Sequence, residues 1–162
     1  MHRVFRRADF CFHAKAEVTR PRYRACSHGI LRGRMSQENV EVVRASMDAF
    51  LAVEFERALS YYCEDVVFQP LVGGPYHGRS GVAQQMQTWV DEFNDYWFEV
   101  DELIDAEDQV VLLWRDGGVG KSSGVRVEQE AATIYTVDDG CISHARVYAD
   151  RARALEAAGL RG

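Results

Sequence analysis

Apolar residues in the first half of the chain recur every three or four positions, which is the spacing of helices with one buried face. The first helix is expected to open at Ser36, a good N-cap residue, with Glu38 in its first turn. Its apolar stripe consists of Val40, Val43, Met47, Phe50 and Leu51. A short second helix is predicted over 55–62, and a third, capped by Ser80, over 80–93. Each large apolar side chain contributes about 1.5–3 kcal/mol when buried, so these stripes are expected to hold the helices against a sheet.

The second half of the chain has the pattern of strands. A short strand is predicted earlier, over 65–69, and a glycine-rich loop over 73–78 follows it. Longer strands are predicted over 98–104, 110–114, 125–137 and 141–148, with a polar loop over 116–124 and a hairpin turn at Asp138-Asp139-Gly140. An alanine-rich tail over 150–160 is expected to be helical. Helices first and strands afterwards indicate an α+β fold, with helices on one face of a curved antiparallel sheet.

Charge divides the 162 residues into two unlike parts. Residues 1–34 hold nine basic and two acidic side chains, a net charge of +7, whereas residues 35–162 hold ten basic and 23 acidic side chains, a net charge of −13. We expect residues 1–34 to be a basic arm, disordered or an upstream extension, and 35–162 to be the folded domain. Because a body at −13 repels phosphate, any nucleic-acid binding would fall to the arm alone, and nucleic acid is not an expected partner of the domain.

The spacing of cysteines and histidines along the sequence does not predict a metal site. Cys11, Cys26, Cys63 and Cys141 occur singly, and the five histidines lack ligand spacing. The pattern favours reduced thiols in a cytoplasmic protein without metal or cofactor. No apolar run reaches the ~20 residues that cross a bilayer, so no membrane partner is expected.

The ordered set of segments resembles the SnoaL-like group of the nuclear transport factor 2-like (cystatin-like) superfamily. The matching segments are 36–50 (SQENVEVVRASMDAF), 58–68 (ALSYYCEDVVF), 74–82 (GPYHGRSGV), 102–115 (ELIDAEDQVVLLWR) and 127–160. The resemblance implies a cone: a curved antiparallel sheet wraps three helices and leaves an apolar pocket at its wide end. It also implies a homodimer formed through the outer face of the sheet. Members include ketosteroid isomerases, polyketide cyclases, epoxide hydrolases and noncatalytic binders, so the fold alone does not fix the function.

The catalytic carboxylates of those enzymes have no counterpart at the matching positions. The place of the isomerase base falls at Gln69-Pro70, and the oxyanion-hole places fall at Ser46 or Met47 and at Thr133. The hydrolase set falls at Gln109, Val111 and Val147. The sequence therefore leaves open whether the domain is an enzyme.

Strand register decides which side chains of the last two strands face the pocket, because side chains alternate across a strand. The resemblance points Thr133 inward, and the predicted ligand-binding residues are then Gln69, Tyr76, Trp89, Gln129, Thr133, Tyr135, Ala145 and Val147. Glu128, Glu130, His144, Arg146 and Tyr148 would lie outside, at a dimer contact. A slip of one residue would instead bring Glu130, His144 and Arg146 together as a catalytic set.

Two functions follow from this pattern. One is a cofactor-free isomerase, cyclase or hydrolase acting on a small hydrophobic molecule, for which a pocket carboxylate or histidine with a shifted pKa is required. The other is a noncatalytic module for ligand binding or dimerisation. Further aromatic candidates for the pocket are Tyr61, Tyr62 and Trp97, with His77 at its mouth. Gly120-Lys121-Ser122 resembles the end of a phosphate-binding loop, but Arg115 stands where that motif needs glycine, so a solvated loop is predicted.

Overall fold

The sheet and helices follow the order predicted for an α+β fold. The computed structural model describes the backbone of residues 22–24 and 32–160, and the side chains of residues 36–160. The helices are α1 (Arg32–Leu51), α2 (Phe55–Ser60), α3 (Gly78–Glu92) and α4 (Arg151–Ala157). The strands are β1 (Arg22–Arg24), β2 (Tyr62–Gln69), β3 (Tyr76–His77), β4 (Phe93–Ala106), β5 (Gln109–Gly120), β6 (Arg126–Asp138) and β7 (Cys141–Tyr148).

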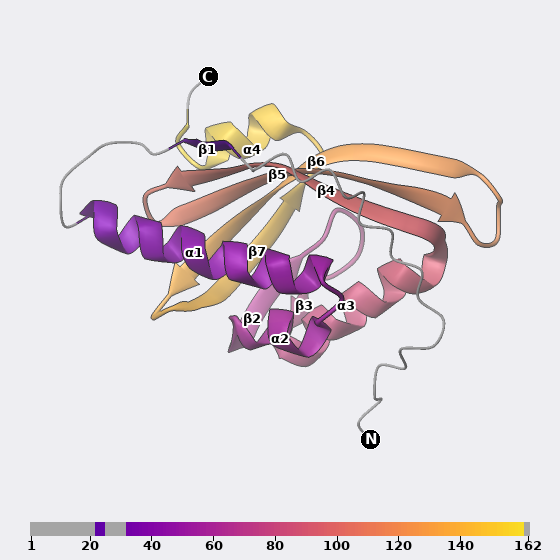
Figure 1. The fold of residues 1–162 in the computed structure, drawn as a ribbon, viewed down its shortest axis with the longest axis horizontal. Coiled ribbons are helices and arrows are strands. Elements are labelled where there is room, and N and C mark those ends of the chain that lie inside the picture. Colours follow the sequence, from indigo (N-terminus) through magenta and orange to yellow (C-terminus); the bar gives the residue numbers. More distant parts are fainter. Residues whose placement is uncertain (1–21, 25–31, 161–162) are drawn as a thin grey trace.

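The strands form one curved sheet in the order β1-β4-β5-β6-β7-β2-β3. The predicted antiparallel run β4 to β7 is confirmed. The sheet is not antiparallel throughout, because β2 pairs parallel with β7 and β1 pairs parallel with β4. Figure 1 shows α1, α2 and α3 on the concave side of the sheet and α4 on the opposite side.

Two apolar clusters hold these layers together. The inner cluster joins α1 and α3 to the concave face through side chains such as Val43, Val82 and Leu112, each at most 1% exposed. The outer cluster joins Ala154 of α4 to the convex face at Val111 and Ala132. The predicted cone around three helices is therefore present, and α4 adds a cover over part of its outside.

Several predicted boundaries are wrong. Helix α1 begins at Arg32, so Ser36 lies inside it, where its Oγ donates to Asp105 Oδ2 at 2.6 Å instead of capping. Helix α3 has His77 as its N-cap, three residues before the cap expected at Ser80. Strand β5 continues to Gly120, through half of the stretch predicted as a loop.

The cysteine prediction is also wrong for one pair. Cys63 and Cys141 form a disulfide between the start of β2 and the start of β7, with Cα atoms 5.1 Å apart. Single cysteines 78 positions apart carry no pairing information, because only the fold brings them together. Cys11 and Cys26 lie outside the described residues.

Residues 22–24 of the predicted arm form β1 beside Glu102, Leu103 and Ile104 of β4. The rest of the arm lies outside the described residues apart from the first turn of α1, and the domain boundary near residue 35 stays a prediction. None of the described helices is both long and apolar enough for a membrane span.

Candidate functional site

The concave face of the sheet and the helices enclose a cavity of about 230 Å³, which we call the inner cavity. Most of its lining is apolar or aromatic, and it includes Phe50, Phe68, Met86, Phe98, Trp114 and Val147. The Phe98 and Trp114 rings stack with their centroids 5.1 Å apart. The loop after β2 forms part of the wall, with Leu71 38% and Val72 87% exposed. These apolar side chains reach solvent at the edge of the cavity, so the loop marks its mouth.

One carboxylate, Asp116, belongs to the lining of this cavity. It lies on β5 directly opposite Gln129 of β6, and only 2% of its surface is exposed. The Tyr96 hydroxyl donates to Asp116 Oδ2 at 2.8 Å, and Trp89 Nε1 donates to the same oxygen at 3.1 Å. The Gln129 side chain favours the charged form of this carboxyl group. Four elements, α3, β4, β5 and β6, thus converge on one acid.

Burial raises the pKa of the Asp116 carboxyl above its ordinary value of 3.8, because the charged form loses its hydration. The side chains of Tyr96, Gln129 and Trp89 favour the charged form and oppose that rise, but burial prevails. Burial, together with the neighbouring charge of Asp116, also raises the pKa of Tyr96 well above its usual 10.0, so this hydroxyl remains a neutral donor. A buried acid whose pKa is raised and which is held by neutral donors is a candidate for proton transfer.

The far end of the cavity carries hydroxyl groups that already have partners. The Tyr135 hydroxyl donates to Met47 Sδ at 3.7 Å, and burial raises the pKa of Tyr62 to about 12. Trp114 Nε1 donates to Thr133 Oγ1 at 2.9 Å. These groups fix the shape of the closed end and stay uncharged at neutral pH.

The strand register is the one predicted with Thr133 facing the helices. Of the predicted ligand-binding residues, the inner cavity brings together Trp89, Gln129, Thr133, Tyr135 and Val147. Ala145 is 1% exposed and belongs to the adjoining inner cluster. Gln69 instead faces a groove on the outside, and Tyr76 lies on β3 outside the lining of both cavities. Of the additional aromatic candidates, Tyr62 lines the inner cavity, whereas Tyr61, Trp97 and the exposed His77 do not.

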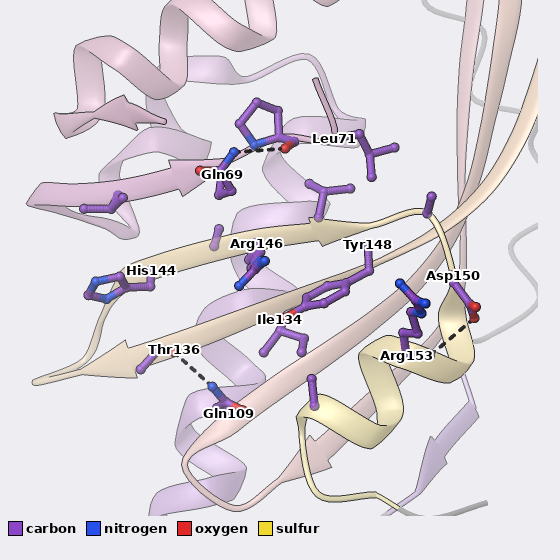
Figure 2. A pocket seen from close by; sticks show the side chains of 16 residues that line it. Gln69, Leu71, Gln109, Ile134, Thr136, His144, Arg146, Tyr148, Asp150 and Arg153 are labelled. Atoms are coloured by element: carbon purple, nitrogen blue, oxygen red, sulfur yellow. Dashed lines mark hydrogen bonds between the residues drawn. The ribbon is translucent and has the colours of Figure 1, made fainter. Parts of the chain in front are cut away.

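The alternative catalytic set does not form in the cavity. Glu130, His144 and Arg146 are exposed on the convex face, and Figure 2 shows His144 and Arg146 along the outside of β7. Whether this face also forms a dimer contact stays a prediction. Among the described residues, no three His, Cys, Asp or Glu side chains are placed to hold a metal ion.

The outer groove, about 770 Å³ in volume, lies on the convex side between α4 and the loop after β2. Pro70, Leu71 and Val147 line both this groove and the inner cavity, so three residues form a wall common to the two. Lys121 and Ser122 lie in the exposed loop 121–125 between β5 and β6, as expected for a solvated loop, whereas Gly120 is the last residue of β5.

The chain belongs to the SnoaL-like domain family, whose model matches residues 43–145. Solved structures with the same fold include an NTF2-like protein from Burkholderia thailandensis E264, with 20% identity and a TM-score of 0.66 over 74% of this chain and 95% of that one. A SnoaL-like polyketide cyclase candidate from Jannaschia sp. CCS1 is 16% identical, with a TM-score of 0.65 over 85% of this chain and 100% of that one. TerC, co-crystallised with polyporic acid, is 19% identical, with a TM-score of 0.61 over 75% and 98%. Comparison with curated protein sequences found no match.

Proposed function

We propose that the inner cavity binds a small hydrophobic molecule bearing a carbonyl or phenolic oxygen, and that Asp116 transfers a proton to or from it without a cofactor. The observation that carries this proposal is the carboxyl of Asp116, 2% exposed and raised in pKa, in the wall of an otherwise apolar cavity. The hydrogen bonds to Asp116 offset only part of the cost of burying its charge, since its pKa remains raised, so packing alone does not account for an acid at this position.

The contacts of Asp116 suggest how the proton would move. Oδ2 accepts from both Tyr96 and Trp89, which holds the carboxyl plane in place. The ionised carboxylate would remove a proton from a carbon next to the ligand carbonyl, leaving an enolate. The resulting carboxylic acid would then return that proton to another atom of the same ligand. One acid acting twice suits an isomerisation or a ring closure, and neither step needs a second ionisable residue in the cavity.

The neighbours in fold support the ligand class and not the reaction. A polyketide cyclase candidate and TerC with polyporic acid share this fold at 16% and 19% identity. A noncatalytic ligand-binding module is the second candidate, favoured by one observation: Asp116 already accepts hydrogen bonds from Tyr96 and Trp89, and no other aspartate, glutamate or histidine in the described part of the chain lines the cavity.

Deuterium exchange separates the two functions. The ketone 2-tetralone is flat and apolar and has acidic protons next to its carbonyl, so a positioned base should accelerate their exchange in D2O. A positioned general base contributes roughly 10²–10⁴-fold, and we expect Asp116→Asn to remove most of the acceleration seen by NMR. The control is Asp108→Asn, which changes an exposed carboxyl in the β4–β5 turn.

Binding of the same ketone is followed by tryptophan fluorescence, because Trp89 and Trp114 line the cavity. Binding without exchange above the buffer rate would rule out the enzymatic function and leave the binding module. Exchange that survives Asp116→Asn would assign the chemistry to another group. Absence of binding would contradict both functions for this class of ligand.

A further inference from the structure

The outer groove is a second candidate binding site, independent of the inner cavity's chemistry. Its floor is formed by the convex faces of β6 and β7, and one wall carries Arg153 and Ala157 of α4. Its volume of about 770 Å³ lies within the ~300–1,000 Å³ typical of small-molecule sites. Figure 2 shows Arg146 and Arg153 at this groove, with the Tyr148 ring between their side chains in that view.

The two groove arginines differ from most arginines of the domain. Arg44, Arg57, Arg115 and Arg151 each form an ion pair with a glutamate or aspartate, and Arg79 donates to a backbone oxygen. Within the part of the chain whose side chains are described, Arg146 and Arg153 form no ion pair and donate no side-chain hydrogen bond. The nearby Asp150 carboxylate accepts from the backbone N–H groups of Ala152 and Arg153 at 2.9 and 3.3 Å. The groove thus holds two guanidinium groups without carboxylate partners in a domain with a large excess of acidic residues.

The groove also offers a flat apolar surface next to these charges. The Arg146 guanidinium carbon lies 5.1 Å from the centre of the Tyr148 ring. Guanidinium donors lie in the plane of the group, so a guanidinium held over a ring keeps them free for a carboxylate or phosphate. Ile134, Val67 and Leu71 extend the apolar lining, and Gln69 and Gln109 bring amide groups to it.

We infer that the outer groove binds a small organic anion with a flat apolar body. Arg146 and Arg153 hold its carboxylate or phosphate, and the body lies along Tyr148 and the apolar floor. The ligand differs from that of the inner cavity, where the buried carboxylate of Asp116 disfavours another anion. The charge of the ligand therefore separates the two sites.

The test uses 1-naphthylacetate and its neutral counterpart 1-naphthylacetamide, which differ in charge and share the same ring system. Each is titrated into the ¹⁵N-labelled full chain, and amide shifts are followed by NMR. We expect saturable shifts at 144–148 and at Arg153 with the acetate, and affinity at least tenfold lower with the amide. Inorganic phosphate alone should bind more weakly than the acetate, because it has no body to pack on Tyr148.

Three variants locate the anion. Arg146→Gln and Arg153→Gln should each weaken acetate binding about tenfold, since each removes a charge-assisted hydrogen-bond donor. Arg126→Gln changes an exposed arginine that does not line the groove and should leave binding unchanged. Asp116→Asn should also leave it unchanged, so failure of the inner-cavity proposal would not affect this result.

Several results would overturn the inference. If 1-naphthylacetate and 1-naphthylacetamide bound equally well, the charge of the ligand would play no role. If Arg126→Gln weakened acetate binding as much as the groove variants do, the attraction would be nonspecific. Shifts confined to the inner cavity would place the ligand there. A dimer in sedimentation experiments that weakens on Arg146→Gln, together with no acetate binding, would identify the groove as an interface between two copies of the chain.

Discussion

The Asp116 carboxyl is buried, which disfavours its charged form, and it accepts hydrogen bonds from Tyr96 and Trp89. Burial opposes ionisation, while Tyr96, Gln129 and Trp89 favour it, and the pKa rises on balance. Because burial and the neighbouring donors act on the pKa in opposite directions, a change in either one shifts the pKa. A ligand that displaces water near Asp116 would raise the pKa of this carboxyl further, and one that donates a hydrogen bond to it would lower the pKa.

The raised pKa makes a prediction about stability. A carboxyl with a higher pKa in the folded chain binds its proton more tightly there than in the unfolded chain. Its stabilising contribution is present below the unfolded-state pKa and is lost as pH rises through the folded-state pKa. We therefore expect the free energy of unfolding of the wild type to fall relative to that of Asp116→Asn as pH rises above the ordinary pKa of an aspartate carboxyl, about 4. Urea unfolding of both proteins at increasing pH measures the difference, and a difference that does not change with pH would contradict the raised pKa.

The sequence hides Asp116 because the residues after it resemble a turn. Asp116-Gly117-Gly118 predicts a loop, yet these glycines lie in a strand for a packing reason. A Cβ on Gly117 would lie 2.8 Å from Trp97 Cζ2, and one on Gly118 would lie 3.0 Å from Phe93 Cβ. Two features of the sequence could have revealed the acid. Leu112 and Trp114 alternate on the buried face, and the same alternation places residue 116 on that face. The strand predicted over 125–137 is long, so the strand that pairs with it should continue beyond residue 114.

Arg151 at the start of α4 links this helix to the sheet by hydrogen bonds. This side chain donates to Asp101 Oδ2 and to the Trp114 carbonyl, both at 2.6 Å, and to the Ala131 carbonyl at 3.2 Å. Asp101 also pairs with Arg115, at 2.8 Å. Burial opposes the charge of Asp101, but its hydrogen bonds and charge interactions with the two arginines outweigh burial and lower the pKa of its carboxyl. The network crosses from β4 over β5 to the C-terminal helix.

Removing the hydrogen bonds of Arg151 should lower the stability of the domain. Arg151→Gln leaves Asp101 short of one partner and two strand carbonyls without their donor. We expect the free energy of unfolding to fall by about 1–3 kcal/mol in urea unfolding. Arg57→Gln, which removes an exposed pair with Glu54, is the matched control and should leave the unfolding midpoint nearly unchanged. Equal effects of the two substitutions would mean that α4 is held by its apolar contacts alone.

Element types could be predicted from the sequence, because they depend on local periodicity. Alternation along β6 and β7 placed Thr133 and Tyr135 on one face and His144 and Arg146 on the other, but only the family resemblance indicated which face lies inside. Helix starts were less accurate, since Ser36 and Ser80 are good caps that the surrounding packing does not use. The seven-residue helix α4 was predicted as a helix, but its position over the convex face depends on Arg151 and could not be read from its composition.

For the whole molecule, the Cys63–Cys141 disulfide joins two strands that pair in parallel. It closes a long segment that contains α3 and β3 to β6, and such a closure restricts the unfolded chain. In the chain-entropy account, a closure of this kind stabilises a domain by about 2–4 kcal/mol. This long-range link is invisible in the sequence, because cysteine spacing alone does not indicate which strands become neighbours.

We expect reduction of this disulfide to lower the urea midpoint of the wild type. The double variant Cys63→Ser/Cys141→Ser should show a similarly lowered midpoint that does not respond to reductant. Unfolding curves with and without reductant provide the comparison, together with thiol quantification of the unfolded wild type. Two free thiols at positions 63 and 141 in the oxidised protein would show that the pair does not form.

The wall of Pro70, Leu71 and Val147 between the inner cavity and the outer groove has a thermodynamic consequence. A ligand in the inner cavity that displaces these three side chains changes the space available in the outer groove, and a ligand in the groove has the same effect on the cavity. Linkage then requires the influence to be mutual and equal in free energy, whichever occupant arrives first. A hydrophobic molecule in the cavity and an organic anion in the groove would then each change the affinity of the protein for the other.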